Sequence, residues 1–332
     1  MLARKRDIKG WGWLAALLLT ACLMPSEAAF ARQAPAAIVI DANTGATLHA
    51  SAPDAYRYPA SLTKMMTIYL VFERLKAGRL KPTSLIRFSK RAAGQQPSKL
   101  GLKPGETISV GDAISALITK SANDVATAVA EHIAGSEIAF ARQMTAKARQ
   151  LGMTRTVFLN ASGLPNSKQV TTARDMARLG LALQKNFPRR YAMFSKRTFA
   201  YKGRRYKNHN RLLGRLAGTD GIKTGYTRAS GFNITTSVRR GSKHIVGVVM
   251  GQRTGRIRDK VMRNLLVKAL PRASESRRRR QLSPQLVARP RLMRQPRAVA
   301  RPVAKRIARP AAKRIARPRP FRGKSYSNQR TT

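Results

Sequence analysis

Cysteine is almost absent from this chain, because Cys22 is the only one among 332 residues. One thiol cannot close an intramolecular disulfide, and it cannot supply a zinc site built from several thiolates. If residues 1–31 are removed as a leader, the mature chain has no cysteine at all. A disulfide scaffold, a thiolate metal site and a cysteine nucleophile are then excluded.

Acidic residues are also scarce: 14 aspartates and glutamates stand against 66 lysines and arginines, a formal net charge of +52. Such a charge attracts any polyanion, including nucleic acid, phospholipid, lipopolysaccharide and teichoic acid, so it names no partner by itself. Long apolar runs are equally rare. The run at 11–24 is short for a membrane-spanning helix of about 20 residues.

The first 31 residues have the order of a secretory signal peptide. Four cations within the first nine residues precede the apolar run, and the small-residue site Ala29-Phe30-Ala31 follows it. This order predicts export to the periplasm or cell envelope, possible association with a membrane, and no nucleic-acid partner. A second form of processing stays open, because Leu19-Thr20-Ala21-Cys22 resembles a lipoprotein signal in which the cysteine is acylated.

Residues 272–332 differ in composition from the rest of the chain. They hold 20 lysines and arginines against one acid, Glu275. Prolines recur every six to eight residues from 284 to 318, and the heptapeptide AKRIARP occurs at 304–310 and again at 312–318. We predict a disordered basic Arg/Pro-rich tail. It either associates with an anionic membrane or envelope surface, or remains solvated without a partner.

Residues 32–271 are expected to form one folded domain, with strands at both ends and helices between them. A first hairpin is expected at 36–41 and 46–49, and a second at 232–238 and 243–250. This order predicts an α+β domain with an antiparallel sheet whose first and last strands meet. The last helix is expected to face the core with Ile257, Val261, Leu265 and Leu266. Helices are predicted at 59–76, 110–119, 124–134, 136–150, 172–185 and 256–270.

Ser61 and Lys64 lie three positions apart near the start of the helix predicted at 59–76. Positions three apart share a helix face, so the hydroxyl and the amine can meet. A mostly apolar segment at 65–72 predicts that the amine is buried, with a lowered pKa, and can act as a base. The helix N-terminus also favours negative charge on an attacked carbonyl. The alternative is a surface lysine beside a helix-capping serine.

Two further tripeptides favour the catalytic interpretation. Ser121-Ala122-Asn123 falls between two predicted helices, and Lys223-Thr224-Gly225 lies in a glycine-rich segment before the second hairpin. The ordered set S-x-x-K, S-x-N and K-T-G is typical of penicillin-binding proteins and serine β-lactamases.

These residue types suit acyl transfer on a peptide that ends in a free carboxylate. Ser61 supplies the nucleophile and Lys64 the base, and Ser121 passes a proton toward the leaving amine. Asn123 can hold a substrate amide. The terminal carboxylate can bind Lys223 and Thr224, while Gly225 allows the substrate backbone to approach closely.

From about residue 37 to residue 251 the chain resembles a bacterial serine-type D-alanyl-D-alanine carboxypeptidase, a low-molecular-weight penicillin-binding protein of the peptidase S11 family. The resemblance implies a β-lactamase/penicillin-binding transpeptidase-like fold, an antiparallel sheet flanked by helices with a helical insert. It is carried by YPASLTKMMT at 58–67, SANDVATAVAEHIAGS at 121–136, LGMTRTVFLNASGLP at 151–165 and TDGIKTGYTRASGFN at 219–233.

The resemblance also implies roles for individual residues. Ser61 would be the acylated serine, Lys64 the proton acceptor, Ser121 a third catalytic residue and Lys223 a substrate-binding residue. The oxyanion hole would come from the backbone N–H groups of Ser61 and Tyr226. The implied reaction removes the terminal D-alanine of peptidoglycan stem pentapeptides without a metal or an organic cofactor, and β-lactam antibiotics would acylate the same serine.

Two alternatives belong to the same superfamily, a β-lactamase-like hydrolase and a D,D-endopeptidase. Class A β-lactamases use a glutamate between the second and third motifs, and no E-x-x-L-N setting occurs between Asn123 and Lys223. The chain also lacks the G-x-S-x-G and H-E-x-x-H motifs of other hydrolases. One departure from the resemblance concerns the C-terminal side, where many relatives have a β-rich domain and an amphipathic anchor and this chain has the basic tail.

Overall fold

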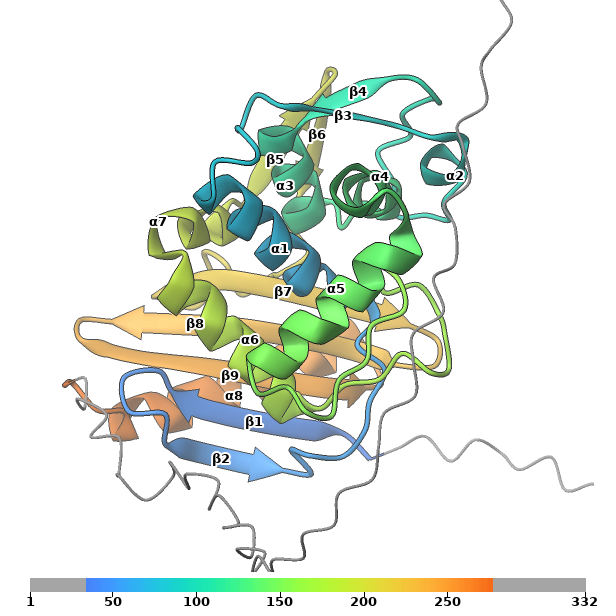
Figure 1. Ribbon diagram of the computed structural model, residues 1–332. Helices are drawn as coiled ribbons and strands as arrows, with labels where there is room; N and C mark the ends of the chain where they lie inside the picture. Colours follow the sequence, from blue (N-terminus) through green and yellow to red (C-terminus); the bar gives the residue numbers. More distant parts are fainter. Residues whose placement is uncertain (1–33, 277–332) are drawn as a thin grey trace, which may run out of the picture. The chain divides into compact units, whose positions relative to one another are not determined.

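The computed structural model describes residues 34–276, which fold around a five-stranded antiparallel sheet with the strand order β2-β1-β9-β8-β7 (Figure 1). Strand β1 pairs with β9, so the expected meeting of the first and last strands is confirmed. The sequence patterns missed β7, which forms one edge of the sheet. The strands are β1 (Ala36–Asp41), β2 (Thr47–Ser51), β7 (Thr219–Thr227), β8 (Gly231–Arg240) and β9 (Lys243–Gln252).

Strand β1 is buried on both faces, which explains its continuous apolar sequence. Because side chains alternate along a strand, Ile38 and Ile40 belong to one core cluster and Ala37 and Val39 to the other. The central strands therefore form a wall between two cores, and their register is fixed from both sides.

Helices cover both faces of the sheet. Helix α6 lies across one face together with the larger helical layer, and α8 packs on the opposite face (Figure 1). The ends of the six predicted helices agree with the prediction to within one residue, except at the start of α1. There the 3-10 turn η1 (Ala60–Thr63) takes the place of the predicted first turn of the helix. The principal helices are α1 (Lys64–Lys76), α3 (Val110–Thr119), α4 (Asn123–Ala134), α5 (Glu137–Gln150), α6 (Ala173–Asn186) and α8 (Gly255–Ala269).

The prediction for the core face of α8 was wrong at its first position. Ile257 is 41% exposed, whereas Met262 and Leu266 are buried in the second core. The reason lies in β9, where Gly247 has no side chain and the Met262 sulfur fills the space that a Cβ would occupy. Packing against this gap rotates the buried face of the helix away from Ile257.

Several short elements were also missed, because three or four residues with partly exposed side chains give little periodic signal. Two small two-stranded antiparallel sheets, β3–β4 and β5–β6, are separate from the main sheet. These elements are β3 (Leu85–Arg87), α2 (Lys90–Ala93), β4 (Thr107–Ser109), α7 (Pro188–Tyr191), η2 (Ala192–Ser195), β5 (Thr198–Tyr201), β6 (Arg204–Lys207) and η3 (Leu270–Arg272).

The folded part of the chain extends beyond the expected boundary at residue 271. Ala273 is buried in the second core, and the backbone N–H of Ser274 donates to Asp41 Oδ2 at 2.8 Å. The first residues assigned to the tail are therefore part of the domain. The predicted signal peptide and the remainder of the predicted tail lie outside the described residues. Within residues 34–276, no helix is both long and apolar enough to cross a membrane.

Candidate active site

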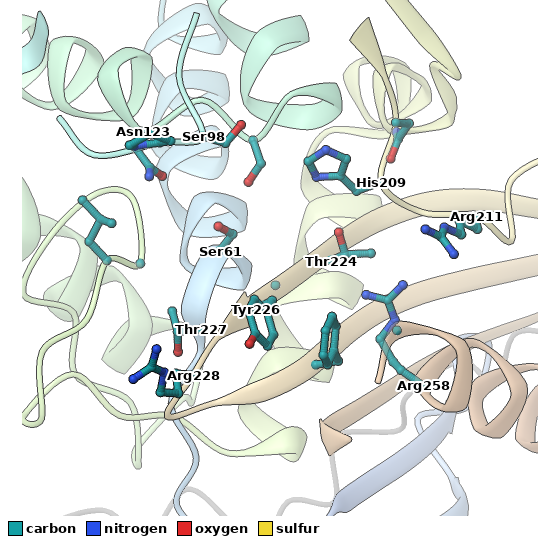
Figure 2. A pocket seen from close by; sticks show the side chains of 18 of the residues that line it. Ser61, Ser98, Asn123, His209, Arg211, Thr224, Tyr226, Thr227, Arg228 and Arg258 are labelled. Carbon is teal, nitrogen blue, oxygen red and sulfur yellow. The ribbon is translucent and has the colours of Figure 1, made fainter. Parts of the chain in front are cut away.

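The predicted site residues converge on one cleft of about 870 Å³. Its walls come from η1, from the segment before α4, from the loop that contains Gly163, from the segment 207–215, from β7 and from the start of α8. Figure 2 shows Ser61 at the end of the α1 segment, facing Thr224 and Tyr226 of β7. Five predicted residues line this cleft: Ser61, Ser121, Asn123, Thr224 and Tyr226.

Ser61 lies on the 3-10 turn that precedes α1. Ala60, the residue before it, has a positive φ of 48°, an unusual conformation for a residue with a side chain. The turn is held against β7, because a Cβ on Gly225 would lie 3.0 Å from both the Pro59 carbonyl oxygen and the Ser61 nitrogen. Gly225 therefore permits close approach of the serine's own turn. The sequence analysis instead expected Gly225 to allow close approach of the substrate backbone.

Lys64, the first residue of α1, is fully buried with 0% exposure. Its Nζ lies 3.2 Å from Ser61 Oγ, 2.7 Å from Asn123 Oδ1 and 2.5 Å from the carbonyl oxygen of Ser162. Burial lowers the pKa of the Lys64 amine well below its ordinary value, and the positive charge of Lys223 lowers it further, while Asp124 and Glu137 act in the opposite direction. The predicted buried amine is confirmed.

The three contacts of Lys64 fit a neutral amine. A neutral amine has two N–H donors and one lone pair, whereas the ammonium has three donors and no acceptor. Asn123 Oδ1 and the Ser162 carbonyl can only accept, and they are the shorter contacts. In the neutral form both donors are then used, which leaves the lone pair of Nζ to accept the proton of Ser61 Oγ, 3.2 Å away.

Asn123 has a different set of partners from the one its sequence position indicated. Its Oδ1 accepts from Lys64, and its Nδ2 donates to the Gln96 carbonyl oxygen at 2.9 Å. The amide thus fixes the lysine and ties α4 to the loop at Gln96. Asn123 still lines the cleft, but its polar atoms already have protein partners.

Ser121 is held in an unusual conformation with its hydroxyl unpaired. Its φ is +60°, and only 5% of the residue is exposed. Its Oγ has no hydrogen-bond partner among residues 34–276. A non-glycine residue in this region costs about 1–3 kcal/mol, which neighbouring structure must offset. The hydroxyl is therefore available to a group that enters the cleft.

Strand β7 carries the third motif along the cleft. Thr224 and Tyr226 line the cavity, and Tyr226 is 53% exposed and stacks on Phe232 with ring centroids 4.1 Å apart. Lys223 is only 1% exposed and is not among the described lining residues. Its Nζ donates to the Thr224 carbonyl oxygen at 3.0 Å. Burial, and then the charge of Arg258, lower the pKa of Lys223 to about 7.

Sequence reasoning missed the loop that supplies the Ser162 carbonyl. A Cβ on Gly163, which has a φ of +84°, would lie 1.9 Å from the Ala60 carbonyl oxygen, so the loop presses directly on the serine's turn. Only the resemblance marked this segment, because every residue has a carbonyl and a backbone acceptor leaves no residue-type signal.

Sequence reasoning also missed the basic residues of the cleft, which are Lys207, His209, Arg211, Arg215, Arg228 and Arg258. The Arg258 side chain donates to Asp259 Oδ1 at 2.7 Å. Loss of solvation in the cleft, followed by repulsion from Lys223 and other cations, lowers the pKa of His209 to about 4, so its ring is neutral at pH 7. Neither Arg258 nor His209 lies in a short motif, and only the folded chain brings them to the cleft.

The D-alanyl-D-alanine carboxypeptidase family, peptidase S11, matches residues 24–254. The curated D-alanyl-D-alanine carboxypeptidase DacC of Escherichia coli strain K12 is 39% identical over 228 residues, which are 67% of this chain and 57% of DacC. This chain therefore spans less than two thirds of the length of DacC.

Solved structures show the same fold. The crystal structure of the D-alanyl-D-alanine carboxypeptidase DacD from Francisella tularensis superposes with a TM-score of 0.68 at 30% identity, over 71% of this chain and 70% of that one. Penicillin-binding protein D2 from Listeria monocytogenes, in its ampicillin-bound form, gives 0.65 at 30% identity, over 71% and 96%. The predicted penicillin-binding fold is confirmed, and this chain belongs to the peptidase S11 family of D-alanyl-D-alanine carboxypeptidases.

Proposed function

We propose that the protein is a serine D-alanyl-D-alanine carboxypeptidase that removes the terminal D-alanine from peptidoglycan stem pentapeptides. The observation that carries this proposal is the buried Lys64 amine, whose Nζ lies 3.2 Å from Ser61 Oγ, beside the edge strand β7. A nucleophile and base within hydrogen-bond reach, with the base held by further groups, are the geometric requirement of covalent catalysis.

The reaction starts when the Ser61 hydroxyl transfers its proton to Lys64 Nζ and Oγ attacks the penultimate carbonyl carbon. The oxyanion is stabilised by the backbone N–H groups of Ser61 and Tyr226. The C–N bond then breaks, and the leaving D-alanine nitrogen takes a proton relayed from Lys64 through the unpaired hydroxyl of Ser121. Water hydrolyses the resulting ester, which releases the shortened peptide and restores Ser61.

The substrate would bind as an added strand along the outer edge of β7. Its terminal carboxylate accepts a hydrogen bond from Thr224 Oγ1, and Arg258 and Lys223 supply positive charge nearby. Arg258 adds to the predicted set of binding residues. The role proposed for Asn123 is to orient Lys64, because its oxygen and nitrogen already have protein partners.

The first test is acylation by a fluorescent penicillin, because β-lactams resemble the terminal dipeptide. We expect the mature protein to be labelled and Ser61→Ala to lose labelling by at least about 10³-fold. Ser51→Ala, which removes an exposed hydroxyl on β2, should be labelled normally. Equal labelling of Ser61→Ala and the parent would refute Ser61 as the nucleophile.

A second measurement separates the alternatives. D-Alanine release from a soluble pentapeptide supports the carboxypeptidase, and release of peptide from cross-linked dimers would indicate an added endopeptidase activity. Fast turnover of penicillin without peptide hydrolysis would instead indicate a β-lactamase-like hydrolase.

We also propose that the protein is exported to the periplasm or cell envelope. The support is the signal-peptide order of residues 1–31, and the basic tail would hold the enzyme near an anionic membrane. The mass of the mature N-terminus distinguishes cleavage after Ala31 from acylation at Cys22.

A further inference from the structure

One end of the β7 edge carries a cation that the proposed chemistry does not use. Arg228 follows directly after β7 and lines the same cleft as Ser61. Figure 2 shows it on the opposite side of Tyr226 from Arg211 and Arg258. It is therefore separate from the group that would bind the terminal carboxylate.

The direction of β7 determines which part of a bound peptide reaches Arg228. If the terminal carboxylate lies at Thr224, an antiparallel peptide extends toward its own N-terminus past Tyr226 and then Thr227. At about 3.3 Å per residue, the leaving D-alanine and the penultimate residue occupy the stretch beside 224–226. The third residue from the C-terminus then lies beside Thr227 and Arg228.

The turn that presents Arg228 is ordered by side-chain hydrogen bonds. The Thr227 N–H donates to Ser230 Oγ at 2.9 Å, and the Ser230 N–H donates to Thr227 Oγ1 at 3.0 Å. Ser230 Oγ also donates to the Gly231 carbonyl oxygen at 2.7 Å. Because this reciprocal pair fixes the backbone on both sides, Arg228 is held at a defined point at the end of the strand.

The charge of Arg228 is available to a ligand. The residue is exposed, and its side chain has no hydrogen bond or ion pair with any other described residue. No aspartate or glutamate is among the described residues that line the cleft, whereas Leu164 and Pro165 provide an apolar wall. The cleft thus offers a peptide one apolar surface and an unneutralised cation at the third position.

We propose that Arg228 forms a subsite for a carboxylate carried by the side chain of the substrate's third residue from the C-terminus. The preferred substrate class is then stem peptides whose third residue is a diamino diacid, rather than a diamino monoacid that ends in an amine. The inference rests on the proposed carboxypeptidase function. An amine at this position would meet the like charge of Arg228 and bind less well.

Two soluble peptides test this subsite. Both end in L-lysyl-D-alanyl-D-alanine, and the lysine side-chain amine is succinylated in one, giving a carboxylate, and acetylated in the other, giving a neutral amide. We expect kcat/KM to favour the succinylated peptide about fivefold at low salt, as for a partly exposed ion pair, and this preference to fall as salt is added. Arg228→Ala should reduce it to below about twofold, and Arg228→Glu should reverse it.

The control is Arg263→Glu on the exposed side of α8, which changes the net charge by the same amount away from the cleft. It should keep the preference of the parent, which excludes general electrostatic steering. The ratio of the two kcat/KM values is measured in one preparation, so partial misfolding of a variant cancels. If neither peptide is hydrolysed by the parent, the proposed function fails; if both are hydrolysed and Arg228→Glu leaves the ratio unchanged, only the Arg228 subsite is refuted.

Discussion

At the scale of the residue, the property that matters is the protonation state of Lys64. The amine is buried next to another buried lysine, so two like charges would lie in a medium that solvates them poorly. The neutral form avoids this cost and makes use of both N–H donors. A residue that is usually a surface cation thus becomes a base because of its surroundings.

The burial of Lys64 predicts a pH-dependent stability. Its pKa is lowered well below 10.5 in the folded state, so between the folded-state pKa and 10.5 the unfolded chain binds a proton that the folded chain does not. Folding stability therefore rises with pH across this window, by about 1.4 kcal/mol per pH unit. Lys64→Met removes this term, so the stability of the parent relative to Lys64→Met should increase from pH 8 to pH 9.5.

The measurement is urea unfolding of both proteins at the two pH values. Lys223, whose pKa is lowered to about 7, contributes its own pH dependence to both proteins and cancels in the difference. Parallel pH dependence of the two proteins would mean that Lys64 keeps its proton when folded.

At the scale of the element, the site depends on turns packed so closely that a methyl group does not fit between them. Gly163 and Gly225 press on the turn that carries Ser61 from two directions. Interiors are packed tightly enough for such contacts to determine atomic positions. The same contact that seats the loop also brings the Ser162 carbonyl to Lys64.

Gly163→Ala should therefore disrupt the site, and Gly152→Ala provides a matched comparison. Both glycines have a positive φ, but a Cβ on Gly152 would have no atom within 4 Å, whereas a Cβ on Gly163 would overlap the Ala60 carbonyl. Gly152→Ala should lower stability by only about 1–2 kcal/mol, the cost of placing a side chain at a positive φ. We expect Gly163→Ala to lower the free energy of unfolding by about a further 1–3 kcal/mol because of overpacking. Its acylation by penicillin should also be much slower. Equal acylation rates in the two variants would contradict this account.

The helices were predictable because their signals are local. The sequence pattern placed their ends to within one residue, except at the start of α1, and Ser136 and Thr172, predicted as first helical residues, are the N-caps of α5 and α6. Strand β7 was missed because Gly221 and Gly225 interrupt its pattern of strand-forming residues. These two glycines stay in the strand because neighbouring elements pack closely against them. The face of α8 was misplaced for a similar reason, because a gap at Gly247 on β9 selects Met262.

At the scale of the whole molecule, the excess of positive charge is divided between the domain and the tail. The sequence from 277 to 332 holds 19 lysines and arginines and no acid. Attraction to an anionic membrane is worth about 1 kcal/mol per basic residue near the surface, and it is screened by salt. Such a segment can concentrate an enzyme at a surface without contributing to its chemistry.

Deletion of 277–332 should leave turnover of a small soluble peptide unchanged and weaken salt-sensitive adsorption to vesicles that contain anionic lipid. Vesicles of neutral lipid are the control for adsorption. Deletion from 272 onward should in addition lower stability by about 1–2 kcal/mol, because it removes buried Ala273 and the hydrogen bond from Ser274 to Asp41. Unchanged adsorption after the first deletion would remove the proposed role of the tail.

The sequence by itself determined the order of the helices, the closure of the sheet by its first and last strands, and the residue types that acyl transfer requires. It also predicted a buried amine, because apolar residues follow Lys64 on its helix. Only the tertiary structure decided which atoms meet that amine, since Asn123 and Ser162 lie 59 and 98 positions away. Local spacing encodes periodicity along one element, whereas contacts between distant elements are set by packing, by glycines that admit close approach, and by backbone carbonyls that no residue type reveals.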